Sequence, residues 1–305
     1  MASQAQRLRD LLARGDLVIA PGVYDGYSAR LVEAAGFETA ATSGAAVSNS
    51  LLGIDDIGVM GLAENVGHCR HIAAAISIPL TADADTGYGN PVNVHYTVQQ
   101  FEQAGVAGVN IEDQVHPKRC GHMPGKEVIP LEDMVKKIEA ACLARKDDAF
   151  MIIARTDALA VEGLDMTVKR VRAYVEAGAD MIFPDAARSE IEIGRIVDAS
   201  RAPVTINMGF GIRARPTTPL IPLPRLAAIG VRRVSLPRML PAAAILGMSR
   251  ALDCMKDVIR TGVPADRPDL AVGIEEIMEL MGYDEMRALE RRLLTDENLT
   301  TKYGR

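Results

Sequence analysis

One pattern occurs four times along the chain: a helical stretch ends in a glycine and runs directly into a short apolar strand. The sequences are EAAGFETAAT, EQAGVAGVNI, VEAGADMIFP and AAIGVRRVSL, around Gly36, Gly105, Gly178 and Gly230. Glycine adopts the left-handed conformation that closes a helix without steric cost, so the chain can turn straight back into a sheet. A chain with this weak internal repeat is expected to alternate helices with strands.

The alternation predicts eight strands, because further apolar runs of similar length lie between the repeats. Strands are expected at 17–23, 38–43, 79–85, 107–112, 149–155, 180–185, 203–207 and 232–236. These runs are almost wholly apolar, which is typical of strands covered on both faces. Eight such units favour an α/β fold of the (β/α)8 TIM-barrel type. An open doubly wound sheet is the alternative, but no strand–GxGxxG–helix unit supports it.

The barrel domain is expected to occupy residues 1–263. Beyond this point the pattern changes to helical stretches at 273–281 and 283–295, followed by a polar tail. Since the barrel is complete without them, we interpret residues 264–305 as a C-terminal helical extension that packs on a neighbouring subunit.

Composition argues against several classes of partner. The net charge is −6, with basic and acidic residues spread along the 305-residue chain, and only 4% of residues are aromatic. A nucleic-acid-binding protein needs a basic stripe or aromatic stacking platforms, so no nucleic acid is expected. No window approaches the roughly 18 apolar residues of a membrane span, so no membrane is expected. The four cysteines form no CxxC pair and predict reduced thiols in a cytoplasmic protein.

Polar residues follow six of the predicted strands at the point where each strand ends. They are Thr42-Ser43-Gly44, Asp83-Ala84-Asp85, Glu112-Asp113, Arg155-Thr156-Asp157, Asp185 and Asn207. Barrel enzymes place their reacting groups at the carboxyl ends of the strands. The alternative is that each polar residue simply begins a surface loop. Several acids and an arginine converging on one rim favour a functional site.

The acidic residues of this rim predict a metal site. Asp83 and Asp85 lie two apart at a strand end, so both can point to one face, and Glu112 ends the next strand. A cluster of carboxylates is unfavourable unless a cation neutralises it. Oxygen ligands without histidine or cysteine favour a hard ion, Mg2+ or Mn2+. The alternative is a set of loop caps and ion pairs.

A second candidate is the segment Lys118-Arg119-Cys120-Gly121-His122, in the long loop after the fourth strand. Cations on both sides of Cys120 favour the thiolate and would attract substrate carboxylates. Gly121 permits close backbone approach to a ligand. The alternative is a solvated basic loop with an incidental thiol.

Taken together, KRCGH, ADADTGYG, TSG, IEDQ and ARTDALAVEGLD resemble the isocitrate lyase/phosphoenolpyruvate mutase superfamily, and within it the 2-methylisocitrate lyases and 2,3-dimethylmalate lyases. The resemblance covers roughly residues 15–260. It implies a barrel whose eighth helix is exchanged between subunits of a homotetramer. It also implies Mg2+ at the barrel mouth and a mobile loop that carries a catalytic cysteine.

The resemblance also implies roles for individual residues. Asp83 and Asp85 would bind the magnesium ion, with Asp56 and Glu112 in its water shell. Ser43, Gly44 and Ala45 would hold a substrate carboxylate, and Arg155 would pair with the keto-acid half. Substrate contacts are further expected from Gly121, His122, Asp185 and Asn207. The reaction implied is retro-aldol cleavage of a small hydroxy-carboxylic acid, with Cys120 as the general acid and pyruvate, or glyoxylate, as the keto product.

Departures from the family pattern leave the substrate open. Ala45 stands where isocitrate lyases carry a tryptophan, which leaves room for a methyl group and favours pyruvate. Asp185 replaces a glutamate, and Ala242 stands where an arginine is expected, with Arg238 close by. The general base is unassigned, with Tyr24 as a candidate. Alternative readings are a small-acid-binding barrel without activity, or a decarboxylase or mutase of the superfamily, although those enzymes lack the KRCGH loop.

Overall fold

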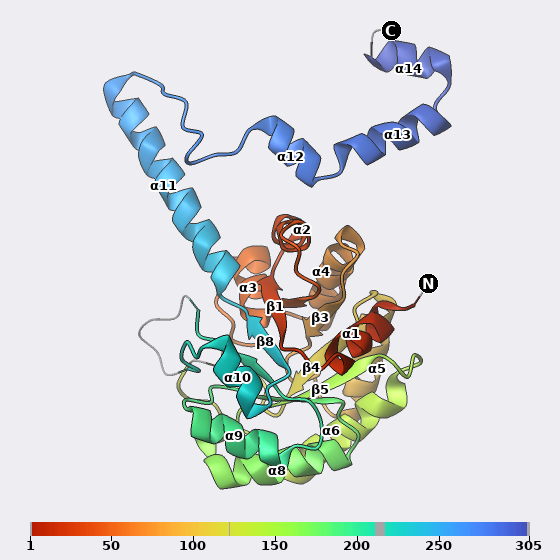
Figure 1. Ribbon diagram of the computed structural model, residues 1–305, viewed down its shortest axis with the longest axis vertical. Coiled ribbons are helices and arrows are strands. Elements are labelled where there is room, and N and C mark those ends of the chain that lie inside the picture. The colour runs from red at the N-terminus through yellow and green to blue at the C-terminus, as the bar shows by residue number, and fades with distance from the viewer. Residues whose placement is uncertain (1, 122, 211–216, 304–305) are drawn as a thin grey trace. The chain divides into compact units, whose positions relative to one another are not determined.

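The computed structural model describes residues 2–121, 123–210 and 217–303, and its central feature is a barrel of parallel strands (Figure 1). The strands are β1 (Val18–Val23), β2 (Ala40–Thr42), β3 (Leu80–Asp83), β4 (Gly108–Glu112), β5 (Met151–Thr156), β6 (Met181–Pro184), β7 (Thr205–Asn207) and β8 (Arg233–Leu236). Every predicted strand is present, and only β5 extends beyond its predicted range, by the single residue Thr156.

The strands pair in the order β6-β5-β4-β3-β2-β1-β8-β7, and every pair is parallel. A bridge between Ile182 and Val204 joins the two outermost strands, β6 and β7, so the sheet closes on itself. The predicted (β/α)8 barrel is therefore confirmed, and the open sheet is excluded.

Helices surround the strands of this unit (Figure 1). They are α1 (Gln4–Ala13), α2 (Gly26–Ala34), α3 (Gly44–Val47), the π-helical turn η1 (Ser48–Leu52), α4 (Leu62–Ala75), α5 (Pro91–Gln103), α6 (Leu131–Ala144), α7 (Ala158–Val161), α8 (Leu164–Glu176), α9 (Glu190–Ala199) and α10 (Leu223–Ile229). The four repeat glycines have φ values of 83°, 88°, 104° and 98°. Each one ends a helix in the left-handed conformation, as the repeat predicts.

The inside of the barrel is filled differently at its two ends. At the amino ends of the strands, Leu8, Leu11 and Leu12 of α1 pack against Met151 and Met181 in a buried apolar cluster. Side chains alternate along a strand, so the inward residues nearer the carboxyl ends form the next layers. Those layers are polar, and they are the part of the fold that forms the site.

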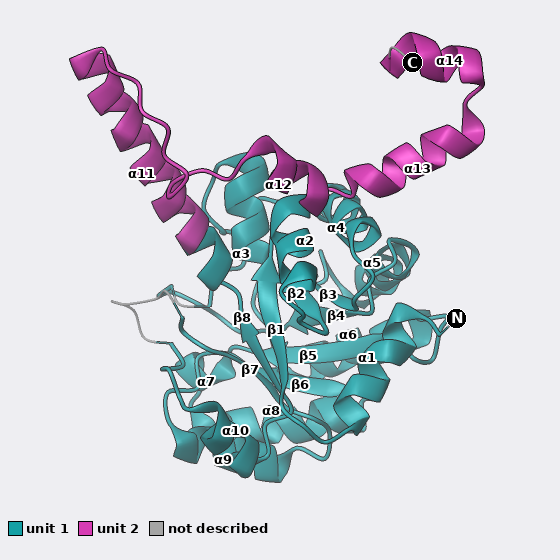
Figure 2. Cartoon of the chain, turned by 45° about the horizontal axis from the view of Figure 1, so that its top comes forward, with its two compact units in different colours: residues 1–242 teal, residues 243–305 magenta. Residues whose placement is uncertain are grey.

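The chain divides into two compact units, residues 1–242 and 243–305 (Figure 2). The division falls within α11 (Met239–Thr261), which is followed by α12 (Ile274–Leu280), α13 (Tyr283–Leu293) and α14 (Asp296–Tyr303). The helical stretches predicted at 273–281 and 283–295 correspond to α12 and α13. The polar tail expected after residue 295 is polar in sequence and forms the helix α14. Within the described ranges, no helix has the length and apolar character needed to cross a bilayer.

Candidate active site

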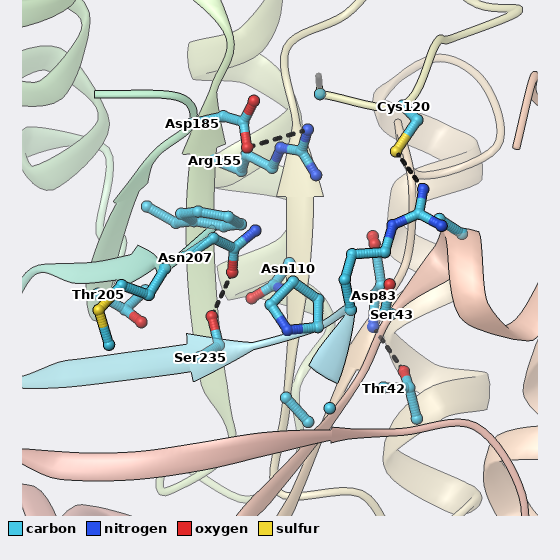
Figure 3. A pocket seen from close by; sticks show the side chains of 18 of the residues that line it. Thr42, Ser43, Asp83, Asn110, Cys120, Arg155, Asp185, Thr205, Asn207 and Ser235 are labelled. Atoms are coloured by element: carbon cyan, nitrogen blue, oxygen red, sulfur yellow. Dashed lines mark hydrogen bonds and ion pairs between the residues drawn. The ribbon is translucent and has the colours of Figure 1, made fainter. Parts of the chain in front are cut away.

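A pocket opens at the carboxyl ends of the barrel strands (Figure 3). Nine of the residues singled out by the sequence line it: Ser43, Ala45, Asp56, Asp83, Cys120, Gly121, Arg155, Asp185 and Asn207. Gly44, Asp85 and Glu112 do not line the pocket themselves but contact residues around it. His122 lies outside the described residues. The structure thus gathers the predicted rim at one place.

Asp83 and Asp85 are held by the turn that follows β3. The Asp83 carboxylate accepts hydrogen bonds from the backbone N–H of Gly44, at 3.0 Å, and of Asp85, at 3.1 Å. Asp85 itself has φ 48°, a left-handed conformation that is unfavourable for a residue with a side chain. A Cβ at position 44 would lie 3.0 Å from oxygens of both carboxylates, a tight contact that glycine avoids.

Lys118 extends from the loop into this acidic cluster. Its Nζ atom lies 2.6 Å from Asp56 Oδ1 and 2.8 Å from Asp85 Oδ1, and its side chain is 2% exposed. The sequence placed Lys118 among the cations around Cys120, not among the carboxylates. Its position makes it the cation that partly neutralises the predicted metal site.

The carboxylates of the acidic cluster are buried close together, an environment that suits a divalent cation. Burial raises the pKa of Asp85 to about 6 even though Lys118 lies beside it. Burial also raises the pKa of Glu112 well above its ordinary value, although Arg155 opposes the rise. Neither carboxylate oxygen of Glu112 accepts a hydrogen bond from any described residue. Buried carboxylates without donors are the groups that a hard cation or its bound water would satisfy.

The described residues contain no group of three or more His, Cys, Asp or Glu side chains placed to bind a metal directly. The predicted arrangement differs from such a group, because only Asp83 and Asp85 would contact the ion and the other two acids would act through water. The donor set is therefore compatible with an ion that keeps several waters, as Mg2+ does.

Arg155, at the end of β5, is held by acids on three sides. Asp157 accepts from its Nε at 2.9 Å and from a terminal nitrogen at 3.1 Å. Glu112 lies 3.1 Å from Arg155. Asp185 lies 3.7 Å from Arg155, as an ion pair drawn in Figure 3. Although burial opposes it, these carboxylates hold the pKa of Arg155 well above its ordinary value. The guanidinium is therefore permanently charged and fixed in direction.

A second buried cluster holds Asp157 in place from behind the site. The Asp113 carboxylate accepts hydrogen bonds from Thr156 Oγ1 at 2.7 Å, the Tyr174 hydroxyl at 2.7 Å and the Asp157 backbone N–H at 2.9 Å. Arg170 of α8 lies 3.3 Å from the same carboxylate. Asp113 thereby acts on Arg155 indirectly, through the position of Asp157.

The loop after β4 brings Cys120 to the pocket. Its backbone N–H donates to the Asp56 carbonyl at 3.1 Å, and Sγ accepts from an Arg238 nitrogen at 3.3 Å. Burial, and next the Asp56 carboxylate, raise the pKa of the thiol, although Arg238 and Lys118 lower it. In this position burial outweighs the nearby cations, so the thiol is favoured over the thiolate that the flanking cations predict. A protonated thiol is the form that can donate a proton.

Lys126 fixes the same loop to the strand ends. Its Nζ atom donates to the Gly121 carbonyl at 2.6 Å and to Asp157 at 2.9 Å, and it lies 3.3 Å from Asp185. A Cβ on Gly121 would lie 2.2 Å from an Asp185 oxygen, so the loop can pack here only with glycine. Sequence reasoning did not select Lys126, whose only sequence signal is a cation directly after Gly125 in the loop that carries Cys120.

Other lining residues lie deeper, and the sequence did not select them. Asn110, Thr205, Arg233 and Ser235 lie on the inward faces of β4, β7 and β8. Their signal is the strand alternation, since each is two residues from another lining position or from a rim acid. Tyr24, the candidate base, is not among the lining residues, and burial raises the pKa of its phenol.

A (β/α)8 barrel with carboxylates, cations and a loop-borne thiol at the carboxyl ends of its strands defines a class: barrel enzymes that act on small anionic substrates. Comparison with known proteins identifies the family. The family model described as phosphoenolpyruvate phosphomutase matches residues 8–256. Probable 2-methylisocitrate lyase 2 of Corynebacterium glutamicum is 39% identical over 289 residues, covering 94% of this chain and 91% of the relative.

Two solved structures carry the same fold. That of 2,3-dimethylmalate lyase, described as a PEP mutase/isocitrate lyase superfamily member, has a TM-score of 0.85 and 34% identity and covers 96% of each chain. That of phosphonopyruvate hydrolase in complex with oxalate and Mg++ has a TM-score of 0.83 and 32% identity, covering 96% of this chain and 100% of the other. The chain belongs to the phosphoenolpyruvate mutase/isocitrate lyase superfamily.

Proposed function

We propose that the protein is a Mg2+-dependent carbon–carbon lyase. It cleaves a 2-methylisocitrate-like or dimethylmalate-like hydroxy acid to pyruvate and a carboxylic acid, succinate or propionate. The observation that carries the proposal is that the Cys120 thiol and the acidic cluster face one pocket. The names of the relatives, 2-methylisocitrate lyase and 2,3-dimethylmalate lyase, support the same chemistry.

The metal would be held by Asp83 and Asp85, with Asp56 and Glu112 acting through water. Mn2+ is the alternative ion, because both ions accept all-oxygen ligand sets. When bound, such an ion polarises the hydroxy-acid end of the substrate and stabilises negative charge on its oxygens. The Glu112 oxygens accept no hydrogen bond from the described residues, although one lies in ion-pair contact with Arg155, and this supports the placement.

The chain's own residues orient the substrate and supply the proton. Ser43, Gly44 and Ala45 hold one carboxylate, and Arg155 pairs with the keto-acid half. A base removes the hydroxyl proton, the carbon–carbon bond breaks, and its electron pair passes to the departing carboxylic-acid half. Cys120 Sγ–H then protonates that carbon. The raised pKa of the thiol supports this role, since it keeps the proton on sulfur until the carbanion forms.

The other half of the substrate would lie under the loop. Gly121 and His122 close over it, and Asp185 and Asn207 contact it from the ends of β6 and β7. The Lys126 contacts to Gly121, Asp157 and Asp185 support a loop that excludes water when it is closed.

The test is detection of pyruvate from 2-methylisocitrate and from 2,3-dimethylmalate, in the presence of Mg2+ and in EDTA. Pyruvate formation that requires the ion is expected from one of the two. Absence of keto acid from every member of a C5–C7 hydroxy-diacid panel would refute the lyase.

A second candidate is a small-acid-binding barrel that has lost the reaction. It is favoured by one observation: Tyr24, the candidate base, is not among the residues that line the pocket. Calorimetry with pyruvate and Mg2+, run beside the turnover assay, separates the two. Tight binding without turnover favours the binding protein, and a phosphonate substrate in the same assay tests the mutase and hydrolase chemistries of the superfamily.

The assembly proposed is a cytoplasmic homotetramer in which neighbouring subunits exchange the helix after β8. Residues 239–261 form a 23-residue helix in which no residue is buried, and Leu252 and Ile259 are 64% and 74% exposed. Apolar side chains on a long helix are expected to be covered by a partner. This surface supports the exchange.

A further inference from the structure

Three polar residues at the floor of the pocket have no part in the proposed chemistry. Arg233 is on β8, Asn110 on β4 and Thr205 on β7, and all three line the pocket. Arg233 pairs in register with Thr205, and it lies two residues before Ser235 on the inward face of β8. We call Arg233, Asn110 and Thr205 the floor cluster.

Each member of the floor cluster has a buried polar atom that lacks a hydrogen-bond partner among the described residues. These atoms are Arg233 Nε, Asn110 Oδ1 and Thr205 Oγ1. One other nitrogen of Arg233 donates to Thr81 Oγ1 at 2.6 Å, which fixes the guanidinium across the barrel. Buried polar atoms are almost always paired, so three orphans lining one pocket indicate a site for a polar ligand.

The charge of Arg233 points to an anion. Arg233 is only 2% exposed, and no carboxylate of the described residues lies within ion-pair distance of its guanidinium group. Burial alone lowers its pKa, to about 10, so the guanidinium stays charged at neutral pH. The rim cations Lys118 and Arg155 are, by contrast, each paired with carboxylates. An unpaired buried charge is strongly unfavourable, and a bound anion would neutralise it.

We propose that the floor cluster is a carboxylate subsite and that the ligand of this pocket is a dicarboxylate. This inference rests on the proposed function for the placement of one carboxylate at Ser43 and Arg155. The second carboxylate belongs to the half of the substrate that Asn207 contacts, and it accepts from Arg233 Nε–H and from the hydroxyl of Thr205, two residues before Asn207 on β7. Asn110 Oδ1 accepts from a hydroxyl group of the ligand. The subsite therefore selects hydroxy-dicarboxylic acids over hydroxy-monocarboxylic acids of the same length.

The test is a binding measurement that needs no turnover. Succinate and propionate, which differ by one carboxylate, are titrated calorimetrically into the wild-type protein and into Arg233→Met and Arg233→Gln variants, with Mg2+ present throughout. The wild type is expected to bind succinate at least tenfold more tightly, since a charge-assisted hydrogen bond contributes about this factor. Both variants are expected to bind the two acids with affinities within about twofold of each other.

The matched control is Arg232→Met, the same change one residue earlier. Arg232 is exposed and donates to the Gly15 carbonyl, away from the pocket. It should keep the wild-type preference for succinate. Thermal unfolding without ligand gives a second readout: the Met variant should be no less stable than the wild type, because it removes an unpaired buried charge.

The subsite is overturned if the folded variants keep the preference for succinate, if Arg232→Met loses it too, or if the wild type shows none. If the Arg233→Met variant does not fold, the preference of the Arg233→Gln variant for succinate over propionate decides the question. A protein that binds succinate through Arg233 but releases no keto acid would refute the lyase and leave the subsite standing.

Discussion

Cys120 is the residue on which the proposed proton transfer depends. Burial raises the pKa of its thiol, and the thiol faces the same pocket as the carboxylates (Figure 3). A Cys120→Ser protein is expected to fold and to bind Mg2+ and pyruvate as the wild type does. Its turnover should fall by about 100-fold or more, because a serine hydroxyl is a much weaker acid than a thiol. Calorimetry measures the binding and steady-state kinetics measures the turnover. Unchanged turnover would contradict the role of Cys120 as proton donor.

Asp85 gives the site a pH dependence that can be measured without substrate. Burial raises its pKa from 3.8 to about 6. The folded protein therefore holds this proton more tightly than the unfolded chain, so the stabilisation is complete below pH 4 and is lost as the pH rises to 6. The pKa difference corresponds to about 3 kcal/mol. In EDTA, the unfolding free energy of Asp85→Asn relative to wild type should therefore rise between pH 4 and pH 7.

Denaturant unfolding of both proteins at several pH values measures this difference. Mg2+ is the internal control: at pH 7 it should stabilise the wild type and leave Asp85→Asn nearly unchanged, because the variant lacks one charged ligand. Parallel pH profiles for the two proteins would contradict the raised pKa.

The sequence identified residues whose position follows from the strand they end, and it missed those that depend on side-chain reach. Asp83 and Arg155 end apolar runs, so alternation and the barrel topology place them at the rim. Lys118 was read as a neighbour of Cys120 because they are close in sequence, yet its ammonium group turns to Asp56 and Asp85. Adjacency in sequence does not show where a long side chain ends, and it does not show how deeply Cys120 is buried, which is the main reason that the pKa of its thiol is raised.

At the scale of elements, the loop between β4 and α6 is attached to the barrel through Lys126. Its buried ammonium group contacts Gly121, Asp157 and Asp185. Lys126→Met should lower the unfolding free energy by about 3 kcal/mol, since it leaves buried carboxylates unpaired. It should also lower kcat more than it raises KM, because the loop that carries Cys120 loses its attachment while the rim that holds the keto-acid half remains.

Lys136→Met is the matched control for this change. Lys136 pairs with Glu139 on the exposed side of α6, where the two side chains are 66% and 46% exposed. An exposed pair of this kind contributes less than about 1 kcal/mol, so activity and stability should stay near wild type. Equal effects of the two substitutions would show that Lys126 does not hold the loop.

The elements themselves follow from local physics with few exceptions. A glycine that must close a helix has one conformation available, and at Gly36, Gly105, Gly178 and Gly230 the structure has it. Residues 296–303 are polar, as the sequence predicts, but they form the helix α14, which the sequence does not predict. That segment, DENLTTKY, lacks an apolar face, so periodicity alone gave no signal for a helix.

At the scale of the whole molecule, counting alternating units was sufficient to predict the barrel, because a parallel sheet of eight strands with helices between them has few ways to cover its faces. The boundary of the C-terminal part, unlike the barrel, could not be predicted from the sequence pattern. The compact units divide at residues 242 and 243, inside α11, whereas the sequence pattern changes only after residue 263. Helical periodicity shows that a helix continues, but it does not show to which compact unit each part of the helix belongs.

The assembly is therefore best tested on α11 itself. Ile245, Met248, Leu252, Met255 and Ile259 recur at helical spacing and are each more than half exposed. In an exchanged helix this stripe would be buried against another subunit, so Leu252→Asp should place a charge in an apolar interface and dissociate the tetramer. Light scattering after size-exclusion chromatography measures the mass directly.

Arg250→Asp is the control. Arg250 lies on the opposite side of the same helix, so this substitution introduces the same aspartate side chain outside the apolar stripe. It should remain a tetramer with wild-type mass. A wild-type protein that is monomeric at micromolar concentration, or a Leu252→Asp protein that stays tetrameric, would contradict the exchange. The mass measurement tests the helix exchange independently of the chemistry of the site, since residues 1–242 of one chain supply the barrel strands and the pocket residues.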